Sequence, residues 1–307
     1  MLPAEKTIKS LLRLAGLRRP AEIQSRLRRF VQRRLLAKRY PRFGVRELRE
    51  TFDRVNVRTG DTLFVHSAWN EFYNFDGKPL DLIRALQEQV GPSGTIAMPA
   101  YPFHIDAAVL FDARRTPTGA GLLAETFRRL ANARRSVHLY HSVAAIGPQA
   151  EYLTADHHNS LTSWDRHSPY ARLAELDATI LCLGLPGSFG LGTSMHCPES
   201  LLYDEIPYFK LVFGAPETYR YRDQSGAEGV HRLLPRVGKW HHSRVRRYIE
   251  AREIRVTHLS NVRIQAVSAR YLIDRMVDLA RQGIVNYYWP WPARRLFRKD
   301  TDSSSRT

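Results

Sequence analysis

The apolar run at residues 178–185 is the feature that most constrains the fold of this chain. A short run without polar alternation is typical of a strand that is buried on both faces of a sheet. Residues 62–67 and 95–99 also have strand character, and the segment 80–90 between them has helical periodicity. This strand–helix–strand order predicts an α/β fold with a mixed, largely parallel central sheet flanked by helices.

The second half of the chain has a different pattern. Residues 208–212, 218–221 and 255–257 indicate shorter, more polar strands, and residues 266–281 indicate a long helix that ends before Gly283. A glycine directly after the last helical turn is a common termination signal.

Positive charge is concentrated at the two ends of the chain. The net charge is +17, of which residues 1–45 carry +11 and residues 294–307 carry +3, which leaves +3 for the body between them. The leader has apolar residues at helical spacing, which predicts basic amphipathic helices that could contact an anionic membrane. We therefore expect a basic helical extension over 1–45, a catalytic domain over 46–285 and an aromatic, basic tail over 286–307.

Other features of the composition restrict the compartment and the class of partner. No apolar stretch approaches the roughly 20 residues that span a bilayer. The two cysteines do not form a disulfide framework, which favours the cytoplasm, with possible attachment to the inner membrane face left open. No known nucleic-acid motif accompanies the basic leader, so a nucleic-acid partner is not expected.

Polar and titratable residues adjoin the predicted strands. His66 and Ser67 end one strand, and open α/β sheets bind ligands at the carboxyl ends of their strands. His138, His141 and Ser142 precede another short strand. A hydrogen-bonded structural histidine is the competing interpretation at each position.

His196 and Glu199 are the strongest candidates for chemistry. Pro198 is best tolerated in a first helical turn, so His196 should lie at the start of a helix and Glu199 within its first turn. A carboxylate there is favoured by the helix dipole and can orient an imidazole. No histidine spacing matches a known zinc site, and we expect no metal.

These segments together resemble the aminoglycoside 3-N-acetyltransferase family, which has the antibiotic acetyltransferase fold. The resemblance rests on eight segments in the family's order, at residues 60–67, 91–99, 111–117, 125–128, 135–138, 141–147, 168–169 and 193–199. Two positions depart from the family pattern: Leu139 stands where the family usually has proline, and residues 165–167 replace a segment that usually carries glycine.

The resemblance implies direct acetyl transfer from acetyl-CoA to a small-molecule amine, without a covalent enzyme intermediate. It implies that His196 is the catalytic base and Glu199 its partner. The implied coenzyme-binding residues are His66, Ser67, Ser142, Val143 and Ala144. Substrate binding or support of the oxyanion is expected from His138, His141 and Glu125.

The charge distribution favours one class of acceptor. An aminoglycoside carries several positive charges and should prefer an acidic site, whereas this body is nearly neutral and its ends are basic. We therefore expect an amino sugar on an anionic or neutral carrier, such as a nucleotide-linked sugar for surface polysaccharide. An aminoglycoside acetyltransferase, and a non-catalytic membrane-surface or scaffold protein with this fold, are the alternatives; a homodimer is left open.

Overall fold

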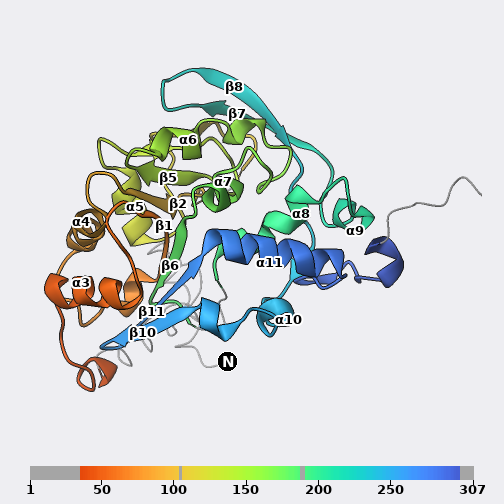
Figure 1. Ribbon diagram of the computed structural model, residues 1–307. Coiled ribbons are helices and arrows are strands. Elements are labelled where there is room, and N and C mark those ends of the chain that lie inside the picture. Colours follow the sequence, from red (N-terminus) through yellow and green to blue (C-terminus); the bar gives the residue numbers. More distant parts are fainter. Residues whose placement is uncertain (1–34, 104–105, 187–190, 298–307) are drawn as a thin grey trace, which may run out of the picture.

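The computed structural model describes residues 35–103, 106–186 and 191–297. A seven-stranded sheet lies at its centre (Figure 1). Its strands, in spatial order, are β10 (Arg255–Leu259), β11 (Val262–Ser268), β6 (Thr179–Leu183), β1 (Thr62–Ser67), β2 (Thr95–Pro99), β5 (Val143–Ile146) and β4 (Arg134–Arg135). Strand β1 is parallel to both β2 and β6, and the remaining pairs in this sheet are antiparallel. The predicted mixed α/β fold is confirmed.

Helices cover both faces of this sheet. One face carries α3 (Val45–Arg54), α4 (Pro79–Val90) and α5 (Leu122–Arg128); the other carries α6 (Ala150–Thr154), α7 (Pro169–Glu175), α8 (Cys197–Leu201) and α11 (Ala269–Arg281) (Figure 1). Successive side chains of a strand point to opposite faces. Leu63 and Val65 of β1 accordingly join the core under α3 and α4, whereas Phe64 joins the core under α7 and α11.

Two predictions from the sequence need correction. The predicted helix at 266–281 begins only at Ala269, because residues up to Ser268 extend β11 along β6, and the Ser268 hydroxyl then caps the helix by accepting from the N–H of Tyr271. The strand predicted at 208–212 is wrong: the structure has the helix α9 (Pro207–Lys210) there. Pro207 begins this helix, where its missing N–H costs nothing.

The remaining strands form two smaller sheets. A three-stranded sheet consists of β3 (Phe111–Asp112), β7 (Glu217–Arg222) and β8 (Glu228–Leu233), and β9 (Lys239–Trp240) pairs with β12 (Tyr287–Trp289). The short helical segments are α10 (Ser243–Arg246) and the 3-10 turns Trp69–Glu71, His157–Asn159, Thr193–His196, Ala251–Glu253 and Arg294–Phe297. The predicted strands at 218–221 and 255–257 lie within β7 and β10.

The two ends of the chain differ in what the structure describes. Most of the predicted basic extension, residues 1–34, lies outside the described residues. The described part of the tail packs on the body, since β12 pairs with β9 and the Phe297 ring stacks on Tyr208 at 4.7 Å between centroids. No described helix is long and apolar enough to cross a membrane.

Candidate active site

His196 and Glu199 lie side by side where a 3-10 turn passes into α8. The turn Thr193–His196 is followed by the helix Cys197–Leu201, with Pro198 in its first turn, as the sequence predicted. Both side chains are 3% exposed, and Glu199 Oε1 lies 3.1 Å from Nδ1 of His196. The sequence therefore places a carboxylate against an imidazole inside the protein.

A guanidinium that the sequence analysis missed completes this group. Arg236, in the connection between β8 and β9, places Nη1 2.9 Å from Nδ1 of His196 and 3.7 Å from Oε1 of Glu199. Its guanidinium lies over the rings of Trp164 and Trp240, 4.9 Å and 5.2 Å from their centroids. These two cation–π contacts favour the position of the arginine beside His196. No sequence signal identifies it, because Arg236 is 40 residues from His196 in an arginine-rich region.

Burial and charge tune both titratable groups. Burial, with a further contribution from Arg236, holds the pKa of His196 well below its usual value of 6.5. Burial raises the pKa of Glu199 to about 8, although Arg236 and Tyr287 oppose the shift. The imidazole is therefore neutral at physiological pH and able to accept a proton, which is the state that a general base requires.

A pocket of about 290 Å³ lies beside His196. Its described lining consists of Tyr101, Tyr140, His141, Gly192, Thr193, His196, Arg236, Trp240 and His242. The pocket brings together parts of the chain that are about 140 residues apart. A small molecule fits a cavity of this size.

The carboxyl end of β1 supports the rim of this pocket. His66 is buried, and its Nε2 accepts a hydrogen bond from the N–H of Thr193 at 3.4 Å. Burial lowers the pKa of His66 to about 4, so this ring is a neutral acceptor. Gly192 has φ +83°, and a Cβ there would lie 2.3 Å from Nε2 of His66. Only glycine allows this approach. Ser67 follows His66 at the half-buried end of the strand.

A buried cluster of histidines lies next to the pocket. His141 lines the pocket and pairs its Nδ1 with the Ser163 hydroxyl at 3.0 Å. His138 lies behind it, fully buried, and its Nδ1 accepts the N–H groups of Tyr140 and His141. The His138 ring stacks on His157 at 4.3 Å between centroids. The structure thus places one of the two predicted histidines at the pocket and the other in a structural layer behind it.

Comparison with known proteins identifies the family. The family model described as aminoglycoside 3-N-acetyltransferase matches residues 64–281. This chain belongs to that family. Its relatives include aminoglycoside N(3)-acetyltransferase IV from a Salmonella species, 36% identical over 156 residues that make up 50% of this chain and 57% of the relative. The type VIII enzyme of Streptomyces fradiae is 31% identical over 58% of this chain and 70% of its own length. The chain thus matches little more than half the length of the Salmonella relative.

Solved structures of aminoglycoside acetyltransferases share this fold. The AAC(3)-IVa apoenzyme has a TM-score of 0.63 at 24% identity, covering 83% of this chain and 98% of that one. A mutant of the same enzyme in complex with gentamicin has a TM-score of 0.64 at 27% identity, covering 80% and 91%. The AAC-IIIb enzyme, solved as a binary complex with CoASH, has a TM-score of 0.65 at 22% identity, covering 79% and 98%.

Several residues that the family resemblance singled out do not line the pocket in this member of the acetyltransferase family. The Ser142 hydroxyl donates to the carbonyl of Ala100 at 2.8 Å. Val143 and Ala144 are fully buried in β5, with their side chains in the cores on opposite faces of the sheet. Their expected contact with the coenzyme stays a prediction.

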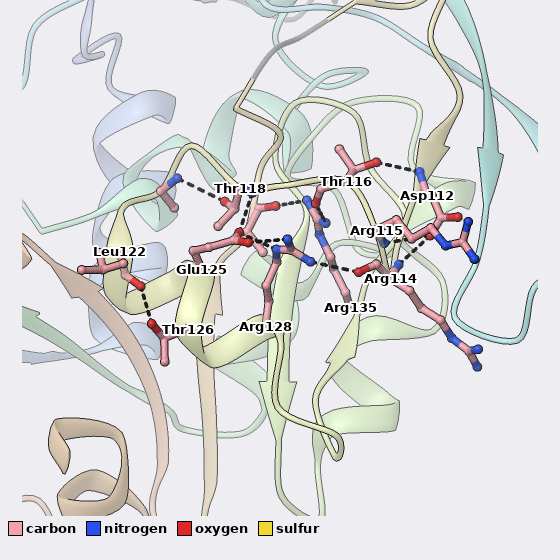
Figure 2. A network of polar contacts seen from close by, with 12 residues as sticks. Asp112, Arg114, Arg115, Thr116, Thr118, Leu122, Glu125, Thr126, Arg128 and Arg135 are labelled. Atoms are coloured by element: carbon pink, nitrogen blue, oxygen red, sulfur yellow. Dashed lines mark hydrogen bonds and ion pairs between the residues drawn. The ribbon is translucent and has the colours of Figure 1, made fainter. Parts of the chain in front are cut away.

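Glu125 belongs to a partly buried polar network and does not line the pocket. Figure 2 shows its carboxylate turned toward Arg128 and the backbone N–H of Thr118. The same network contains Arg135, whose guanidinium donates to the carbonyls of Ala100 and Thr116. These bonds tie the 112–118 loop to α5 and to the end of β2. Among the described residues, no cluster of His, Cys, Asp or Glu could hold a metal ion.

Proposed function

We propose that this protein transfers the acetyl group of acetyl-CoA to a primary amine, with His196 as the general base. The amine nitrogen attacks the thioester carbonyl, His196 takes the proton from that nitrogen, and the carbon–sulfur bond breaks as coenzyme A leaves. The proton on the imidazole then passes to the departing thiolate, which balances the reaction. The observation that carries this proposal is the buried His196–Glu199 pair beside a pocket, in a member of a family named for acetyl transfer.

The neutral state of His196 suits this chemistry. An ammonium ion has no lone pair, so the base must remove a proton for attack to occur, a contribution typically worth 10²–10⁴-fold in rate. His66 and Ser67, at the carboxyl end of β1, are our proposed contacts for the coenzyme, together with the Ser142, Val143 and Ala144 segment. His141, which lines the pocket, is our first candidate for substrate binding or oxyanion support, and His138 and Glu125 are our further candidates for the same roles.

We propose an amino sugar on an anionic carrier, such as a nucleotide-linked sugar of surface polysaccharide synthesis, as the acceptor. None of the described residues that line the pocket carries a carboxylate. A polycationic aminoglycoside would find no counter-charge on that lining. Aminoglycoside 3-N-acetylation is the second candidate, and the names of the relatives and the gentamicin complex of one of them favour it.

A thiol-release assay over a panel of acceptors tests this function. The panel should hold glucosamine, a uridine-diphosphate-linked amino sugar, gentamicin and apramycin, each with acetyl-CoA as donor. We expect turnover of the nucleotide-linked sugar and a rise in melting temperature with acetyl-CoA, because a ligand that binds only the folded state stabilises it. Turnover of the aminoglycosides alone would select the second candidate. Absence of both turnover and thermal stabilisation would reject acetyl transfer.

Peripheral attachment to an anionic membrane is a further part of this proposal. Its support is the basic N-terminal segment and the exposed aromatic side chains of Tyr288, Trp289 and Trp291 in the tail. Sedimentation with vesicles of neutral and of anionic lipid tests it, with binding expected only to the anionic vesicles. A homodimer also stays a prediction, which analytical ultracentrifugation tests.

A further inference from the structure

The charge facing the pocket comes from one residue. Burial holds the pKa values of His141 and His196 well below 6.5 and lowers that of His242 to about 4, so these rings are neutral. Arg236 is then the only formal charge on the described lining. Two described acids contact lining residues: Glu199, which lies against His196 and is 3% exposed, and Glu217, which accepts from the Tyr140 hydroxyl. The pocket therefore offers an acceptor one cationic contact.

The contact of Arg236 with His196 also determines the tautomer of the imidazole. A guanidinium can donate hydrogen bonds but cannot accept them. A contact of 2.9 Å between Nη1 and Nδ1 therefore requires an unprotonated Nδ1, and the neutral ring must carry its hydrogen on Nε2. Glu199 Oε1 lies 3.1 Å from the same Nδ1 and 3.7 Å from Nη1 of Arg236. With Arg236 in this place, Glu199 cannot orient the ring as it does in a carboxylate–imidazole pair.

The described contacts of the Arg236 guanidinium include one hydrogen bond, to a neutral imidazole, and two aromatic rings. The side chain is 17% exposed, so it is accessible to a ligand that enters the pocket. A phosphate or carboxylate forms paired, charge-assisted hydrogen bonds with guanidinium, which are stronger than a single bond to a neutral imidazole.

We propose that Arg236 selects an acceptor that carries an anionic group near its amine, and that binding of this group draws the guanidinium away from His196 and lets Glu199 take its place. The hydrogen on Nε2 passes to water, Nδ1 takes a hydrogen from water, and the carbonyl oxygen of the Glu199 carboxyl accepts from Nδ1–H. Nε2 then has the free lone pair that the base needs. The raised pKa of Glu199, about 8, keeps this carboxyl neutral, so the exchange of hydrogens on the imidazole leaves the net charge of the pair unchanged. This inference rests on the proposed function and adds the acceptor class and the step that activates the base.

A matched pair of acceptors tests the selection. Glucosamine and glucosamine 6-phosphate present the same amine and differ by one phosphate. We expect the parent enzyme to prefer glucosamine 6-phosphate by at least about tenfold in kcat/KM, the size of one good charge-assisted contact. Arg236→Met should lower kcat/KM for the phosphate ester about tenfold and raise kcat/KM for glucosamine, because His196 is then released without an anion. Arg232→Met, an exposed arginine of β8, is the control and should change neither. If Arg236→Met lowered kcat/KM equally for glucosamine and glucosamine 6-phosphate, the inference would be overturned.

A second readout does not depend on turnover. Nitrogen-15 NMR of histidine-labelled protein reports which ring nitrogen carries hydrogen, and His196→Gln identifies the signal. We expect the Nε2–H tautomer in the free enzyme and the Nδ1–H tautomer after addition of glucosamine 6-phosphate or in Arg236→Met. An Nδ1–H tautomer in the free parent enzyme overturns this inference and leaves acetyl transfer intact. Failure of acetyl transfer would instead appear as no turnover of any acceptor by any variant, whatever the tautomer.

Discussion

The buried histidines next to the pocket should make this protein sensitive to mild acid. His157 is fully buried, with its Nδ1 3.0 Å from the Ser136 hydroxyl and its Nε2 3.2 Å from the carbonyl of Ser163. Burial holds the pKa of His157 well below 6.5, and the same is true of His138 and His141 around it. The perturbation we choose is His157→Gln, which removes one of these groups and keeps a polar side chain.

The size of the effect follows from proton linkage. Below pH 6.5 the unfolded chain protonates its histidines, whereas a histidine with a depressed pKa stays neutral in the folded state. The unfolded state then binds more protons, so the free energy of unfolding falls as the pH falls from 6.5 toward the folded pKa. Each such group contributes up to about 1.4 kcal/mol per pH unit, or about 1.4 kcal/mol in total at pH 5.5. Glu199 has a raised pKa, so its contribution to the free energy of unfolding changes with pH in the opposite direction. This contribution is the same in the parent and the variant and cancels in their difference.

Urea unfolding at pH 8.0 and pH 5.5 measures this difference. We expect the parent protein to lose about 1.4 kcal/mol more than His157→Gln between the two pH values, whatever the stability of the variant at pH 8.0. His258→Gln, a substitution at an exposed position of β10, is the control variant. A pH dependence in His157→Gln equal to that of the parent would refute the reasoning.

Two further predictions concern the pocket. Gly192→Ala should lower the free energy of unfolding by about 1–3 kcal/mol. The reason is that residue 192 has a positive φ and that a Cβ there would lie 2.3 Å from Nε2 of His66. A urea midpoint equal to that of the parent would contradict the close approach. In Arg236→Met the acidic limb of the pH–rate profile should move to higher pH, because Arg236 helps to depress the pKa of His196 and the base form is then lost earlier on acidification. An unchanged limb would show that burial alone sets that pKa.

The sequence predicted the elements that are defined by local pattern. Apolar runs predict the strands β1 and β2, and the position of Pro198 predicts the first turn of α8. The spacing within one helical turn predicts the His196–Glu199 pair. Contacts between segments that are distant in the sequence cannot be predicted from such local patterns. Arg236 reaches His196 only because the connection after β8 folds back over the pocket, and its tryptophan partners come from residues 164 and 240.

The helix α9 shows why a local pattern can also mislead. Residues 208–212 are apolar and aromatic enough for a strand, yet Pro207 starts a helical turn and the side chains of Tyr208 and Phe209 are buried in the core on one face of the sheet. Tertiary packing outweighs β propensity at such short segments. Glu125 illustrates the same limit for contacts, since the hydrogen bond that it accepts from the N–H of Thr118 depends on the path of the loop before α5, which the sequence does not specify.

Acetyl-CoA turnover by His196→Ala is the measurement that bears most directly on the central claim. We predict that kcat/KM falls by 10²–10⁴-fold, the usual contribution of a general base, while acetyl-CoA still raises the melting temperature of the variant. The control is His231→Gln, which alters a buried histidine bonded to Tyr219 and the carbonyl of Ser160 and absent from the described pocket lining. A His196→Ala enzyme whose kcat/KM stays within about threefold of the parent value would contradict the role of this imidazole as the base.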